Sequence, residues 1–72
     1  MSYAIAFDWP DVPEPVYAAR VGDSLGWAFS VADEATLICE TEEEAGRWLA
    51  NGYPSNSRFG YIIDAESGEK IR

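Results

Sequence analysis

Carboxylates dominate the side chains of this sequence that could do chemistry. The chain has 13 Asp and Glu residues against 5 Lys and Arg residues and no histidine, so its formal net charge is −8 over 72 residues. Paired carboxylates can act as general acid and base, but only where burial separates their pKa values. The acids here fall in expected turns and at an expected helix start, where water solvates them. Because nucleophilic catalysis of the Ser–His or Cys–His kind also needs the missing histidine, we expect no enzyme and no catalytic residues.

Cys39 is the only cysteine, and its surroundings point to a structural role. A single cysteine cannot form an internal disulfide, and one cysteine without histidine cannot supply the usual zinc ligands. No glycine-rich phosphate loop, EF-hand or dinucleotide fingerprint is present, so we expect neither a metal nor a cofactor. Cys39 lies in an expected strand and not in a basic pocket, which is typical of a small buried apolar side chain.

The single cysteine also indicates the cellular compartment of the protein. A free cysteine fits the reducing cytoplasm better than a secreted setting. The N-terminus has no basic segment followed by an apolar run, and no apolar stretch approaches the ~20 residues of a membrane span. We therefore expect a cytoplasmic protein that does not bind a membrane.

One segment of the chain is uniformly acidic. From Val21 to Gly46 there is no Lys or Arg, and Asp23, Asp33, Glu34, Glu40, Glu42, Glu43 and Glu44 all fall there. Acidic disordered chains are poor in aromatic residues, whereas this chain is 14% aromatic, so it is expected to fold. Two interpretations of the acidity stay open: it keeps a small folded protein soluble, or it matches a basic partner.

Six of these acids form the candidate partner-binding surface: Asp33, Glu34, Glu40, Glu42, Glu43 and Glu44. If the turn that carries Asp33 lies near the helix start, one surface presents all six carboxylates without a cation. Such a surface imitates the phosphates of a nucleic acid, which proteins recognise mainly through Lys and Arg. The expected partner is therefore a protein with a basic surface, above all a nucleic-acid-binding one. Phage proteins that inhibit CRISPR or restriction systems are often small and acidic in this way, although no motif is shared.

A second candidate surface is the polar loop from Tyr53 to Arg58, in which Tyr53, Asn56 and Arg58 are the expected contact residues. Such residues adapt well to protein interfaces, but the loop is equally typical of an ordinary polar connection. The five cations, Arg20, Arg47, Arg58, Lys70 and Arg72, are scattered along the chain. Direct nucleic-acid binding needs a basic stripe, so we do not expect it.

The elements that must position these residues follow from hydrophobic periodicity. Alternation with β-forming residues predicts strands over Tyr3–Phe7, Val16–Val21, Trp27–Val31, Thr36–Glu40, Phe59–Asp64 and Glu69–Arg72. In the first of these, Ile5 and Phe7 share one face, and Ala4 and Ala6 share the other. The three prolines between residues 10 and 15 end this strand in a rigid loop.

Thr41-Glu42-Glu43-Glu44 fits a capping box and predicts a helix from there to about Ala50. Ala45, Trp48 and Leu49 form an apolar stripe along this helix. Asn51-Gly52 and then Pro54 are expected to end it. A helix this short is not stable alone in water, so it must lie on the sheet.

The sequence therefore predicts one α+β domain over residues 1–72. The expected fold is a single antiparallel sheet of five to six strands with one short helix on one face, in the order β-β-β-β-α-β-β. The predicted core consists of Ile5, Phe7, Val21, Trp27, Phe29, Val31, Leu37, Cys39, Ala45, Trp48, Leu49, Tyr61 and Ile63. Two functions remain: an acidic inhibitor that covers a basic protein surface, or an interaction module without mimicry. Whether the protein is a monomer or a homodimer stays open.

Overall fold

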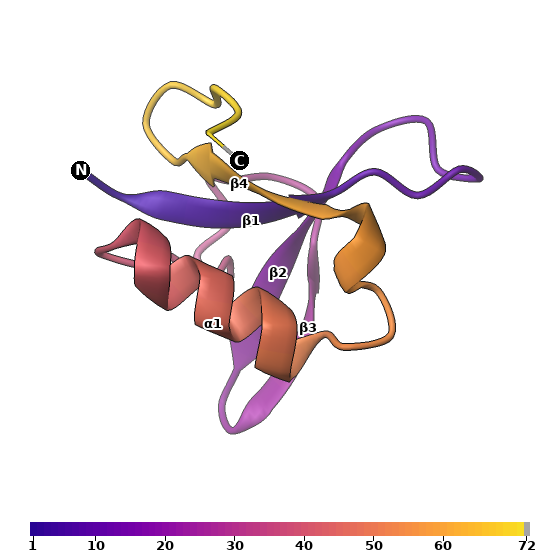
Figure 1. Ribbon diagram of the computed structural model, residues 1–72, viewed down its shortest axis with the longest axis horizontal. Coiled ribbons are helices and arrows are strands. Elements are labelled where there is room, and N and C mark those ends of the chain that lie inside the picture. The colour runs from indigo at the N-terminus through magenta and orange to yellow at the C-terminus, as the bar shows by residue number, and fades with distance from the viewer. Residues whose placement is uncertain (72) are drawn as a thin grey trace.

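A computed structural model describes residues 1–71. The elements in chain order are β1 (Tyr3–Phe7), β2 (Val16–Val21), β3 (Ser24–Ala28), α1 (Glu42–Gly52), the short 3-10 helix η1 (Ser57–Phe59) and β4 (Gly60–Asp64). The strands form one antiparallel sheet in the order β3-β2-β1-β4, and α1 lies across one side of it (Figure 1). The predicted α+β class with one antiparallel sheet and one helix is confirmed, but the described sheet has four strands and not five or six.

The central strand β1 separates two apolar clusters because its side chains alternate between the two faces of the sheet. Ile5 and Phe7 belong to the main cluster, which also contains Ala45 of α1. Ala4 and Ala6 belong to a smaller cluster with Ile63 on the opposite face. The bounds of β1 and the assignment of its two faces are as predicted.

The expected fourth strand, Thr36–Glu40, is instead a short connection that joins two diverging strands. β1 and β2 pair over only two positions before they separate. Beyond that point Leu37 donates its N–H to Ala18 of β2, and Cys39 exchanges two backbone hydrogen bonds with Tyr3 of β1, all at 2.8–2.9 Å. The prediction of a strand is wrong because these residues bond to two different strands, with single bridges at Thr36 and Cys39.

The expected third strand begins earlier than predicted. Gly22 has φ +62° and Asp23 does not have positive φ, which is the pattern of a two-residue type II′ hairpin turn. The chain therefore returns at Ser24, and β3 ends at Ala28 instead of continuing to Val31.

The last expected strand, Glu69–Arg72, also reduces to a single bridge, Ile63 to Lys70, and Arg72 lies outside the described residues. The turn before it matches the prediction, with Gly68 at φ +78°. Phe59, expected to begin the preceding strand, belongs to η1, so β4 begins at Gly60.

A variant of the capping box is present at the start of α1, in which Glu44 reaches the N–H of the residue before the cap. The Oγ1 atom of Thr41 accepts a hydrogen bond from the N–H of Glu44 at 3.1 Å. In return, Oε1 of Glu44 accepts one from the N–H of Glu40 at 3.1 Å. These bonds satisfy two backbone donors and fix the angle at which the chain enters the helix. The helix runs two residues past the expected end, to Gly52.

Replacing Thr41 by alanine is therefore expected to lower the free energy of unfolding by about 0.5–2 kcal/mol, because the N–H of Glu44 loses its acceptor. Urea denaturation followed by tryptophan fluorescence measures the change, and Thr41→Ser serves as the control because serine keeps the hydroxyl. Equal denaturation midpoints for the alanine variant and the wild type would show that Thr41 does not cap the helix.

Two predicted core residues lie outside the core, and a third, Trp27, lies at its edge, where its ring contacts Phe7 and Tyr53. Val21 and Phe29 are 67% and 83% exposed, and Trp27 is 39% exposed. Their side chains do alternate with their neighbours as the prediction assumed. However, Val21 and Trp27 belong to the β2–β3 hairpin at the edge of the sheet, Phe29 follows it, and no second layer covers this hairpin completely. Four residues that were not predicted, Val16, Ala18, Tyr53 and Ile62, complete the main cluster.

Candidate functional site

The helix start gathers four of the six candidate acids on one short stretch of chain: Glu40, Glu42, Glu43 and Glu44. Glu40 and Glu43 are exposed, and Glu42 and Glu44 are half-buried. Acids in the first turn suit the positive end of the helix dipole. Because Glu44 is held by the capping box, Glu40 and Glu43 are the two side chains most accessible to a partner.

Cys39 lies directly beneath this acidic turn. Its side chain is 1% exposed. Burial raises the pKa of the Cys39 thiol to about 11, with further contributions from the charge of Glu44 and from a hydrogen bond to it. A thiol with so high a pKa is almost entirely protonated at neutral pH and is a poor nucleophile, in agreement with its expected structural role.

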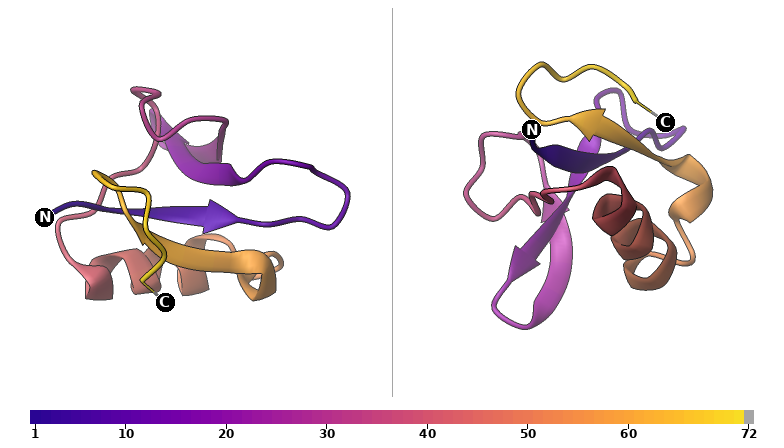
Figure 2. Two further views of the ribbon diagram at one scale, coloured as in Figure 1. Left: turned by 90° about the horizontal axis from the view of Figure 1, so that it is seen from above. Right: turned by 60° about the vertical axis from the view of Figure 1, so that its left-hand side comes forward.

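Asp33 and Glu34, the other two candidate acids, lie in the loop that follows β3. Oδ1 of Asp33 accepts a hydrogen bond from the N–H of Ala35 at 2.8 Å, so this carboxylate has a local structural role. Val31, at the start of the loop, packs against the cluster on the face that α1 does not cover. Figure 2 (left) shows the loop and α1 on opposite sides of β1. The structure therefore divides the six acids into two groups, Glu40–Glu44 and Asp33–Glu34.

The three candidate residues of the polar loop also differ in position. Tyr53 is only 5% exposed, and its hydroxyl donates to the carbonyl oxygens of Gly26 and Ala19, at 3.0 and 3.2 Å. Burial raises the pKa of the Tyr53 hydroxyl, and the backbone hydrogen bonds partly oppose this effect. Arg58 is exposed and lies over the ring of Phe59, 4.7 Å from the ring centre. Asn56 is half-buried, so the accessible part of this candidate surface is Asn56 and Arg58.

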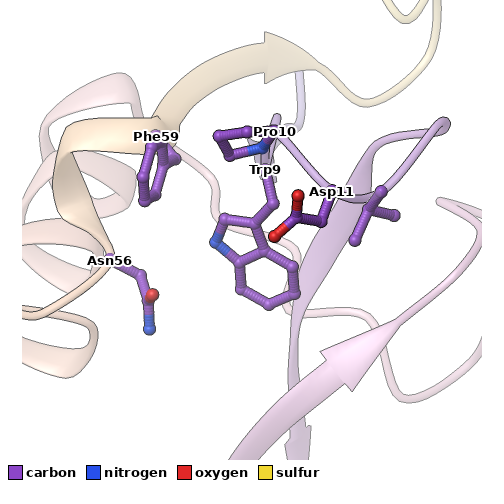
Figure 3. A pocket seen from close by; sticks show the side chains of 6 residues that line it. Trp9, Pro10, Asp11, Asn56 and Phe59 are labelled. Carbon is purple, nitrogen blue, oxygen red and sulfur yellow. The ribbon is translucent and has the colours of Figure 1, made fainter.

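Asn56 lines a hollow that sequence reasoning missed (Figure 3). The hollow has a volume of about 440 Å³ and is lined by Trp9, Pro10, Asp11, Val12, Asn56 and Phe59. Its inner wall continues into a cluster of rings, since the Trp9 and Trp27 ring centres lie 4.5 Å apart. The only signal in the sequence is the Trp-Pro pair at the start of the proline-rich loop, which does not show that η1 folds back beside it.

A second, smaller hollow of about 310 Å³ lies along the side of α1, lined by Glu44, Arg47, Trp48 and Asn51. Within residues 1–71, the structure has no group of three or more His, Cys, Asp or Glu side chains that could hold a metal ion. In the same range no helix combines the length and apolar character needed to cross a membrane.

Comparison with models of protein families, with curated proteins and with solved structures found no match to this chain. The surfaces described above are therefore the basis for inferring the function.

Proposed function

We propose that this protein binds a basic surface of another protein and blocks it, and that the acidic helix start is its main contact. The observation that carries the proposal is the placement of Glu40 and Glu43, exposed and next to two further glutamates, at the first turn of α1. Charges gathered on one turn create a stronger local potential toward a basic partner than the same charges dispersed over the surface.

The rigidity of the turn adds to this argument. Thr41 and Glu44 fix the chain entry, and Ala45, in the next turn, is fully buried in the main cluster. Side chains on an anchored helix lose less conformational freedom on binding than side chains on a loop. The turn is thus pre-organised as an array of carboxylates, in the way that a phosphate backbone is an ordered array of negative charge.

The proposed partner is a nucleic-acid-binding protein, because such a protein has a ready-made site for ordered negative charge. The proposed activity is competitive: the bound acidic protein excludes the nucleic acid. Small phage-type inhibitors of CRISPR or restriction systems provide the analogy of class. The lone buried thiol agrees with action in a reducing compartment such as the cytoplasm.

The test uses a double variant, Glu40→Lys with Glu43→Lys, and a matched control, Glu34→Lys with Glu66→Lys. Both variants change the net charge equally, and all four side chains are exposed. Asp33 and Glu44 are left unchanged because their carboxylates hold backbone donors. Immobilised protein captures partners from cell lysate at low salt, and duplex DNA is then added as a competitor.

We expect DNA and high salt both to release the captured partner. For the helix-start variant, association with that partner should be about tenfold slower at low salt, and the control should lose much less. Equal association rates for the helix-start variant and the wild type would rule out the proposed contact.

The aromatic hollow favours a second candidate function, an interaction module without mimicry. Grooves lined by aromatic side chains bind extended peptide segments, proline-rich ones among them. Such a contact is mainly apolar and so persists at high salt. Partners that stay bound in high salt and are lost from an Asn56→Ala, Arg58→Ala variant would support this function instead.

A further inference from the structure

The chain covers nearly every open edge of its sheet with one of its own segments. The outer side of β4 is covered by the C-terminal segment. The N–H of Asp64 donates to the carbonyl of Glu69 at 2.9 Å, and the N–H of Ile71 donates to the carbonyl of Ile62 at 2.8 Å. The gap between β1 and β2 is filled by the connection through Leu37. The outer side of β3 is the exception among the described residues, since β3 is the end strand and pairs only with β2.

The hydrogen bonds of β2 show which groups of β3 lie on its open side. The N–H of Arg20 donates to Ala35 and the carbonyl of Ala18 accepts from Leu37, so both residues direct their backbone groups away from β3. In an antiparallel pair, two residues opposite each other direct these groups either toward or away from one another. Leu25 and Trp27 are opposite Arg20 and Ala18. Their N–H and C=O groups therefore point outward, where residues 1–71 supply no backbone partner for them.

This open edge lacks the features that usually protect one. Natural edge strands carry lysines, prolines or inward-pointing charges that discourage pairing with another chain. No charged residue and no proline occurs between Asp23 and Asp33, although the whole chain is 25% charged. Leu25 and Trp27 are 37% and 39% exposed and lie on the same face of β3. The edge thus combines unpaired backbone groups with partly exposed apolar side chains.

We propose that β3 pairs in antiparallel fashion with β3 of a second copy of this chain, about a two-fold axis that passes beside Gly26. This register places Leu25 of each copy opposite Trp27 of the other copy. In each of these two pairs, the outward N–H of one residue donates to the outward carbonyl of the opposite residue, which gives two hydrogen bonds per pair. The two glycines face each other at the axis, where there is no side chain to keep the strands apart. The result is a continuous sheet across two molecules.

A second copy fits this edge better than a charged segment of another protein. β3 is uncharged over its whole length, so it offers no counter-charge to a charged segment of another protein. When two copies of β3 pair, no like charges face each other. The leucine of one copy packs beside the indole of the other, which extends the cluster in which Trp27 meets Phe7 at 5.0 Å. Aromatic–aliphatic cross-strand pairs of this kind stabilise sheets.

The dimer and the proposed acidic contact respond to salt in opposite directions. Two copies of net charge −8 repel each other, so added salt should strengthen the dimer. A contact between carboxylates and a basic partner weakens as salt is added. A salt series therefore distinguishes failure of the dimer proposal from failure of the proposed acidic contact.

Sedimentation equilibrium of the purified chain, from micromolar to millimolar concentration at low and high salt, tests the association. We expect a monomer–dimer equilibrium that shifts toward dimer at high salt. Leu25→Lys should raise the dissociation constant by about tenfold or more, since a charge is then buried at the new strand pair. Val21→Lys is the matched control, because Val21 is 67% exposed and lies on β2, away from the open edge. A wild type that stays monomeric throughout, or a dimer unaffected by Leu25→Lys, would overturn the proposal.

A cross-linking experiment tests the register. No atom lies within 4 Å of a Cβ built at Gly26, so Gly26→Cys fits without strain. Opposed residues at such a position have Cα atoms about 4.5 Å apart, which suits a disulfide. Gly26→Cys should oxidise to a covalent dimer much faster than Ser24→Cys, whose two copies lie far from each other across the axis. Equal or faster cross-linking of Ser24→Cys would exclude this pairing.

Discussion

Replacing Phe7 by alanine is expected to lower the free energy of unfolding by about 3–5 kcal/mol, which is comparable with the whole stability of a domain this small. The Phe7 side chain is fully buried. Its ring lies 5.0 Å from that of Trp27 and 5.3 Å from that of Tyr53, measured between ring centres. Alanine leaves a cavity at the point where β1, β3 and the end of α1 meet. The variant is therefore expected to be largely unfolded at room temperature.

Near-ultraviolet circular dichroism and urea denaturation measure this effect. Phe29→Ala is the matched control, since Phe29 is 83% exposed and its loss should change stability by no more than about 0.5 kcal/mol. Phe7→Leu should remain folded and lose only about 1.5 kcal/mol or less, because leucine fills most of the volume. If Phe7→Ala and Phe29→Ala have similar midpoints, the main cluster is not built around Phe7.

Replacing Tyr53 by alanine is expected to destabilise the protein by a similar amount, about 3–5 kcal/mol. The ring packs against Phe7 and Trp27, and the hydroxyl donates to carbonyl oxygens of both β2 and β3. Tyr53 thereby ties the end of α1 to the β2–β3 hairpin. Removing the hydroxyl alone, in Tyr53→Phe, should cost about 0.5–1.5 kcal/mol.

Thermal and urea denaturation of both Tyr53 variants provide the measurement, with Asn56→Ala as a control from the same loop. The experiment also decides between two roles for this residue. A contact residue on a binding loop can be removed without loss of stability, as the sequence suggested for Tyr53. Should Tyr53→Ala prove as stable as the wild type, the residue belongs to the binding surface and not to the core.

The local elements of this fold were largely predictable, because each depends on a short run of residues. The alternation of Ile5 and Phe7 with two alanines gives the bounds and the faces of β1. The spacing of Thr41 and Glu44 gives the start of α1, and the three glutamates there suit the helix dipole. In each case the deciding interactions lie within a few residues along the chain.

The errors concern segments whose partners are distant in sequence. Leu37 and Cys39 alternate as strand residues do, but nothing in their sequence shows that each bonds to a different strand. Phe29 follows the pattern of β3, yet the strand has already ended and no element covers the side chain. Periodicity shows which residues share a face, but not whether another layer covers that face.

The same limit applies to the candidate site. The acidic residues of the helix start were identifiable because Glu42, Glu43 and Glu44 are contiguous. The sequence left open whether Asp33 and Glu34 join them, and the topology places these two on a loop from the other face. The aromatic hollow was missed because Trp9 and Asn56 come together only when η1 folds back over the start of the proline-rich loop.

The central position of β1 has a consequence for how this chain is made. Of the four described strands, β1 is synthesised before the others, yet one of its neighbours, β4, is synthesised after them, with Tyr3 opposite Asp64. During translation Ile5 and Phe7 therefore lack their neighbours on β4 until residues 60–64 have emerged. Such long-range closure slows folding and leaves an apolar strand available to other nascent chains. The heavy negative charge of the segments made in between would keep those chains apart during this interval.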